Sequence, residues 1–105
     1  MYYPVSSLLI EFLILSVVSR KDSYGYEISQ TVKLAAEIKE STLYPILRRL
    51  QQSGFLTTYN QEYQGRNRKY YSITDSGRDQ LKYLAGEWKI YKDTIDGIME
   101  GRLSG

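Results

Sequence analysis

Five basic side chains lie close together in the middle of the chain: Arg48, Arg49, Arg66, Arg68 and Lys69. Glu62 is the only acidic residue between positions 48 and 71, so this segment has a net charge of +4, whereas the whole chain of 105 residues has +2. Arginine and lysine contact the phosphates of nucleic acids, and arginine also hydrogen-bonds guanine edges. The sequence therefore indicates double-stranded DNA as the first partner to consider.

Residues for catalysis or metal binding are scarce in this sequence. The chain has no cysteine and no histidine, which removes disulfides, thiol nucleophiles, imidazole bases and the usual zinc ligands. We therefore expect a protein that is not an enzyme and that holds no metal and no cofactor.

The first basic pair falls on a predicted helix over residues 41–50. Ser41 is a suitable N-cap, and Pro45 falls in the first turn, where proline does not break a helix. Gly54 follows as the expected C-terminal glycine. A buried stripe at helical spacing is formed by Leu43, Ile46, Leu47 and Leu50.

The other basic residues fall on a predicted β-hairpin, with strands at 55–59 and 68–74 and a loop at 62–67. A helix followed by a β-ribbon is the order of a winged helix. On the helix alone, an ordinary surface helix with solvated arginines is an equal alternative, but a basic hairpin in the right order favours DNA. The residues predicted to contact DNA are Ser41, Thr42, Tyr44, Pro45, Arg48, Arg49, Arg66, Arg68, Lys69 and Tyr71.

Two further helices are predicted before residue 41. The first runs from Leu8 to about Ser19, is capped by Ser6 or Ser7, and is apolar on nearly all sides, so it must be buried on several faces. The second begins near residues 24–28 and points Ile28, Val32 and Ala35 inward.

A last helix is predicted with Thr74 or Asp75 as its N-cap, ending near Gly101 and Gly105. Its apolar residues recur at intervals of three and four, the heptad pattern of a helix that pairs with another helix. Packing on its own domain is the alternative, but a small domain gains stability by dimerising. The predicted homodimer seam is Leu81, Leu84, Trp88, Tyr91, Ile95 and Ile98.

The longest apolar run, residues 8–15, is interrupted by Glu11 and falls short of the roughly 20 residues that span a bilayer. No basic region precedes it and no small-residue cleavage site follows it. We expect a cytoplasmic protein with no membrane partner.

Three motifs, in this order, resemble the PadR family of bacterial transcriptional regulators, and specifically its short members with a single C-terminal helix. They are residues 24–28 (YGYEI), residues 41–50 (STLYPILRRL) with 54–56, and residues 65–74 (GRNRKYYSIT) with 77–78. One departure is Asn67, where the family often has proline between the two arginines, so a more flexible hairpin tip with the same charge is expected.

The resemblance implies a dimeric winged helix-turn-helix repressor, in which the first and last helices form the dimer and the third enters the major groove. Similar short members hold planar hydrophobic compounds near a tryptophan of the last helix, a position matched by Trp88. The walls of such an aromatic effector site would be Phe12, Ser16, Leu84 and Tyr91. Plain dimer packing is an equal alternative for Trp88.

The sequence thus predicts a mainly α fold with a small β-ribbon, in which residues 1–74 form the winged helix-turn-helix domain and residues 75–105 a dimerisation helix. The function that we expect is a repressor that reads an inverted-repeat operator. The alternative is a winged-helix module that recruits another protein through its tyrosine-rich surface and does not read DNA sequence.

Overall fold

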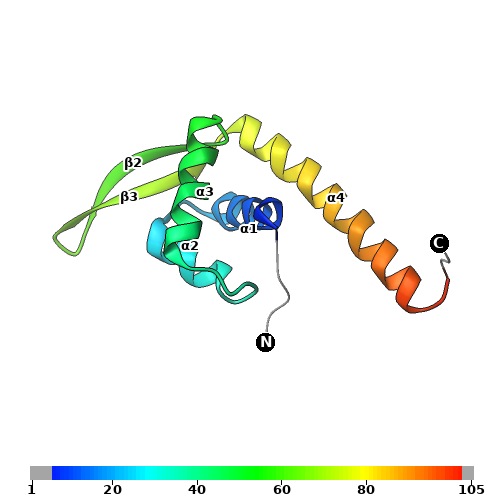
Figure 1. The fold of residues 1–105 in the computed structure, drawn as a ribbon. Coiled ribbons are helices and arrows are strands. Elements are labelled where there is room, and N and C mark those ends of the chain that lie inside the picture. Colours follow the sequence, from blue (N-terminus) through cyan, green and yellow to red (C-terminus); the bar gives the residue numbers. More distant parts are fainter. Residues whose placement is uncertain (1–5, 103–105) are drawn as a thin grey trace.

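A computed structural model describes residues 6–102 (Figure 1). Two helices and three strands form a winged helix-turn-helix, which is preceded by one helix and followed by a longer one. The elements are α1 (Ser7–Arg20), β1 (Ser23–Tyr24), α2 (Gly25–Val32), α3 (Glu40–Gln52), β2 (Leu56–Tyr63), β3 (Arg66–Ile73) and α4 (Asp75–Met99). The predicted mainly α fold with a β-ribbon is confirmed. Gly105, expected near the end of α4, lies outside the described residues.

Helix α1 is the centre of the core, as its nearly uniform apolar sequence predicted. It packs against α2, α3, β3 and α4. Its fully covered side chains include Ile10, Ile14, Leu15 and Val18. Ser6 is the N-cap, and its hydroxyl accepts a hydrogen bond from the Leu9 backbone N–H at 3.2 Å.

Helix α2 buries Ile28 and Val32 as predicted, but the prediction for Ala35 is wrong, because Ala36 lies in the core and Ala35 is exposed. The helix ends at Val32, but the next turn keeps the helical spacing of four residues, since the Ala36 N–H also bonds to the Val32 carbonyl, at 3.0 Å. Ala36 therefore continues the buried face of Ile28 and Val32.

Helix α3 confirms the predicted stripe, since Leu43, Ile46, Leu47 and Leu50 are all buried. The prediction of Ser41 as the N-cap is wrong: the cap is Lys39, and Glu40 opens the helix. Pro45 therefore lies in the second turn, where it has no N–H for the Ser41 carbonyl. At the other end, Gly54 has φ 83°, as expected for the residue that closes this helix.

The wing formed by β2 and β3 is longer than predicted. The strands pair from Leu56↔Ile73 out to Tyr63↔Arg66, so most of the predicted loop at 62–67 is strand. Only Gln64 and Gly65 turn, with φ of 52° and 78°, as a two-residue type I′ hairpin requires. The short strand β1, which the sequence did not predict, adds to β3 and gives a sheet of order β1-β3-β2.

Helix α4 leaves the wing at Thr74, whose hydroxyl accepts a hydrogen bond from the Gly77 N–H at 3.0 Å, as the predicted cap. Gly77 is required by packing, because a Cβ there would lie 2.1 Å from the Phe55 carbonyl oxygen. The first half of α4 lies against α1, and the second half projects away from the rest of the protein (Figure 1). Over the described residues, no helix is both long and apolar enough to cross a membrane.

Candidate nucleic-acid interface

The outward face of α3 carries five of the predicted DNA-contacting residues. All five are exposed, as recognition of bases or phosphates requires. They are Ser41, Thr42, Tyr44, Pro45 and Arg48. Because the opposite stripe of α3 is fixed in the core, this face is held rigidly toward solvent.

Glu40 fixes the start of α3 against α2. Its carboxylate pairs with the Lys33 ammonium and accepts a hydrogen bond from the Ser29 hydroxyl at 3.4 Å. The hydrogen bond from Lys33, together with one from the backbone N–H of Glu40 itself, lowers the pKa of Glu40 below its usual value. These contacts link the start of α3 to α2 and to the residue that follows α2.

The two arginines of α3 have different surroundings. Arg49 Nη2 lies 3.4 Å from Oε2 of Glu11 on α1, a carboxylate whose side chain is only 15% exposed. Within residues 6–102, by contrast, no carboxylate lies within 4 Å of the Arg48 guanidinium. Arg49 therefore ties α3 to α1, while the Arg48 charge remains unneutralised on the exposed face.

The wing presents its three predicted cations differently. Arg66 and Lys69 are exposed, and Arg68 is half-buried. Tyr71, which was predicted to contact DNA, is 7% exposed and belongs to the hydrophobic core, so only the small part of its side chain that lines the hollow described next remains accessible. Successive side chains of a strand point to opposite faces, and the sequence did not show which of the two adjacent tyrosines faces the core.

A hollow joins the start of α2 to α3 and β3. It brings together two of the three basic residues of β3 and several tyrosines, of which Tyr24 and Tyr26 had no predicted role. Gly25 allows this arrangement, since a Cβ there would lie 2.9 Å from the Tyr44 ring. The lining residues are Tyr24, Gly25, Tyr26, Tyr44, Arg68, Lys69 and Tyr71.

The outer face of the sheet carries a ladder of tyrosine rings. Tyr70 stacks on Tyr59 with centroids 5.6 Å apart and meets Tyr24 edge-on at 5.6 Å. The Tyr59 hydroxyl donates a 2.7 Å hydrogen bond to the Asp22 carboxylate, which raises the pKa of Tyr59. The ladder therefore connects the wing to the segment that precedes α2.

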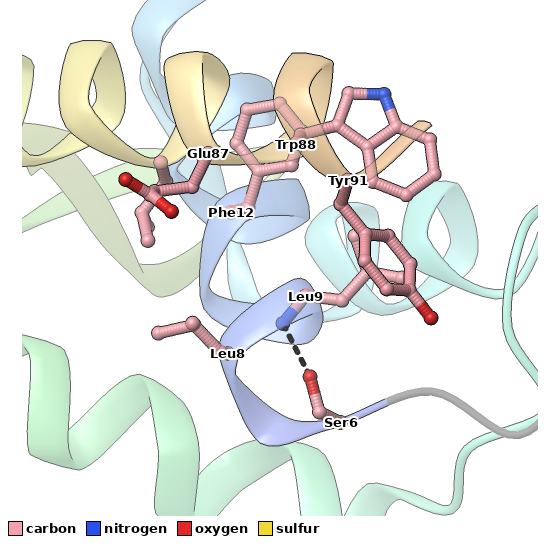
Figure 2. A pocket seen from close by; sticks show the side chains of 8 residues that line it. Ser6, Leu8, Leu9, Phe12, Glu87, Trp88 and Tyr91 are labelled. Atoms are coloured by element: carbon pink, nitrogen blue, oxygen red, sulfur yellow. Dashed lines mark hydrogen bonds between the residues drawn. The ribbon is translucent and has the colours of Figure 1, made fainter. Parts of the chain in front are cut away.

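A separate aromatic cavity of about 510 Å³ lies between α1 and α4 (Figure 2). Four of the predicted effector-site residues line it: Phe12, Leu84, Trp88 and Tyr91. Ser16 does not line this cavity, and its hydroxyl donates to the Phe12 carbonyl at 2.8 Å, so its role in an effector site stays a prediction. The lining residues that the sequence did not indicate are Ser6, Leu8, Leu9 and Glu87.

The predicted dimer seam divides into two parts in the single chain. Leu84 is 2% exposed and Leu81 is half-buried, so both pack on their own domain. Leu84 thus has no surface left for a partner helix, and its assignment to the seam is corrected. The rest of the seam is exposed and consists of Trp88, Tyr91, Ile95 and Ile98.

A helix-turn-helix followed by a two-stranded wing, with unneutralised basic side chains on both, defines a winged-helix DNA-binding protein. The chain belongs to the family described as "Transcriptional regulator PadR-like family", whose sequence model matches residues 14–83. The resemblance noted from the three motifs is thereby confirmed. Members of this family are DNA-binding regulators of transcription and not enzymes.

Known proteins are similar to this chain over most of its length, in agreement with its membership of the family. A crystal structure of a protein from Streptococcus mutans UA159 is 67% identical, has a TM-score of 0.97, and matches 100% of this chain and 99% of that one. A PadR family transcription regulator from Clostridium difficile is 33% identical, with a TM-score of 0.79 over 86% of this chain and 97% of that one. A protein from Lysinibacillus sphaericus is 39% identical over 97 residues, which are 88% of this chain and 89% of that protein.

Proposed function

We propose that this protein is a dimeric transcriptional repressor in which α3 reads base edges in the major groove and the wing contacts the DNA backbone or the minor groove. Residues 1–74 act as the DNA-binding unit and residues 75–105 as the dimerisation helix. The observation that carries the proposal is the placement of unneutralised charge. In the described part of the chain, Arg48, Arg66, Arg68 and Lys69 have no carboxylate partner within 4 Å.

Pairing is common among the other ten basic residues. Six of them have a carboxylate within 4 Å: Lys21, Lys33, Arg49, Lys89, Lys92 and Arg102. The other four, Arg20, Lys39, Arg78 and Lys82, have none among residues 6–102, but they are spread over separate elements, whereas the four unpaired cations of α3 and the wing lie on two adjoining ones. A cation without an anion partner keeps its full attraction for phosphate, and each phosphate contact releases counterions from DNA.

The dimer is supported by the exposed apolar face of α4. Trp88, Tyr91, Ile95 and Ile98 are 39–61% exposed and lie along one side of a projecting helix. A contiguous apolar stripe of this kind marks an association surface. A two-fold dimer through α4 would carry two copies of α3, which suits an operator made of two inverted half-sites.

The effector site is supported by the cavity between α1 and α4. It opens beside the exposed aromatic part of the seam, where Trp88 and Tyr91 have centroids 6.2 Å apart at a tilt of 43°. Glu87 brings a carboxylate to this cavity, whereas Lys92 does not line it and pairs with Asp96 at 3.2 Å. A planar aromatic compound with positive charge is the class of ligand that fits best. Such a ligand relieves repression only by binding the DNA-free arrangement more tightly than the DNA-bound one.

A competition assay tests the repressor proposal. The DNA upstream of the protein's own coding region is searched for an inverted repeat. A duplex with that repeat and a random duplex of equal length are then titrated at one salt concentration by fluorescence anisotropy. A repressor should prefer the inverted repeat by at least about 10³. Equal affinity for both duplexes would contradict the proposal and favour the alternative, a winged-helix module that recruits a protein.

A further inference from the structure

Arg68 of the wing is held between two tyrosine rings. Its Cζ atom lies 4.3 Å from the centroid of the Tyr24 ring and 4.9 Å from that of Tyr63. Tyr24 lies on β1 and Tyr63 on β2, and β3 runs between these strands in the sheet. The two rings therefore reach Arg68 from opposite sides.

The strand register explains why these rings meet Arg68. Tyr24 pairs with Tyr70, and Tyr63 pairs with Arg66, so each direct partner is two residues from Arg68 along β3. Residues two apart on a strand share a face, and diagonal neighbours on that face are within reach of long and aromatic side chains. The stack is thus fixed by the backbone pairing of three strands.

The stack leaves the hydrogen-bonding capacity of Arg68 available. Contact with ring faces is electrostatic and dispersive, and it does not use the five N–H donors of the guanidinium group. No carboxylate of residues 6–102 lies within 4 Å of those donors. Arg68 also lines the hollow at the start of α2, together with Lys69 and Tyr44. Two cations at one hollow favour an oxyanion as its occupant.

We propose that Tyr24 and Tyr63 are positioning residues that hold Arg68 in place for one backbone phosphate of DNA, seated in the hollow between α2, α3 and β3. This inference rests on the proposed function, because it assigns a single phosphodiester contact to the DNA-binding surface. A long side chain that is already ordered loses less conformational entropy when it binds. Without the Tyr63 ring, Arg68 keeps its charge but must be ordered by the DNA.

The test is a double-mutant cycle on a random-sequence duplex, because a phosphate contact does not depend on base sequence. Affinities are measured by anisotropy across a salt series for wild type, Arg68→Ala, Tyr63→Leu and the double variant. Tyr63 is chosen because it is 49% exposed near the wing tip, where leucine leaves the core intact. Circular dichroism confirms the fold of each variant.

The two single variants should differ in their salt dependence. Arg68→Ala should reduce the slope of log affinity against log salt by about one, the value for one lost phosphate contact. Tyr63→Leu should weaken binding about two- to tenfold at every salt concentration and leave the slope unchanged. Tyr63→Phe keeps the ring and should bind as wild type does. In the Arg68→Ala background, Tyr63→Leu should have no further effect.

Tyr59→Leu is the matched control, since Tyr59 lies on the same strand and face but stacks on Tyr70 and not on Arg68. An equal loss for Tyr59→Leu would mean a general effect on the sheet and would overturn the inference. Additive losses in the double-mutant cycle would also overturn the inference, because they would show that Tyr63 contacts DNA itself. Tighter DNA binding by Tyr63→Leu would overturn it too, because it would show that the two rings keep Arg68 away from DNA. Absence of salt-dependent binding by wild type would instead contradict the proposed function.

Discussion

The exposed part of the α4 seam allows a quantitative test of dimerisation. Ile95 and Ile98 are 43% and 60% exposed in the single chain, so roughly half of each side chain remains to be buried by a partner. Full burial of an isoleucine contributes about 1.5–3 kcal/mol, which leaves about 1 kcal/mol for each position. Replacing both by serine affects four side chains of a dimer and should cost about 4 kcal/mol, raising the dimer dissociation constant about a thousandfold.

Sedimentation equilibrium of the Ile95→Ser, Ile98→Ser variant measures this constant directly, and circular dichroism checks that the monomer stays folded. Ile90→Ser is the matched control, because Ile90 lies on the same helix, is 62% exposed and falls outside the heptad positions. We expect the control to remain dimeric. A double variant that dimerises as well as wild type, or a control that dissociates equally, would refute the seam.

Three further outcomes are expected. Arg48→Ala should lose about 1–3 kcal/mol of discrimination between operator and random DNA in competition titrations, whereas Arg49→Ala, whose charge is shared with a carboxylate on α1, should lose less. The pKa of Glu40 is lowered in the folded protein, so ionised Glu40 stabilises the fold at pH values above the unfolded-state pKa. This stabilisation is lost as the pH falls through the folded-state pKa. The melting temperature of Glu40→Gln should therefore depend less on acid than that of wild type below the usual carboxyl range. Trp88→Ala should weaken the binding of a planar cationic aromatic compound about tenfold in calorimetry, measured at protein concentrations at which sedimentation shows the variant to be dimeric, and equal binding by both proteins would leave Trp88 only a packing role.

The sequence was sufficient wherever local pattern decides structure. The buried stripe of α3, the closing glycine Gly54 and the cap Thr74 each follow from residue types within one or two turns of the chain. The order of helix and basic hairpin is also local, and it indicated the winged helix. These features need no knowledge of what packs on them.

Features set by distant partners could not be predicted. Strand β1 has two residues, too few for a pattern, and exists only because β3 pairs with it. Leu84 has the same heptad spacing as Ile95, yet it is buried because α1 lies beside that part of α4. The hollow beside Tyr24 likewise joins three elements that are separate in the sequence. Helix start signals were also ambiguous, since α3 begins at Glu40 with no side-chain cap although Ser41 was available.

The central claim is that two copies of α3 read two half-sites at a fixed separation. Its most direct test is the affinity of the wild-type protein for the upstream inverted repeat before and after about five base pairs, half a helical turn, are inserted between the half-sites. We predict that the insertion removes most of the preference over random DNA, because the second half-site then faces away from the second α3. An unchanged preference after the insertion would contradict a two-fold dimer that reads both half-sites together.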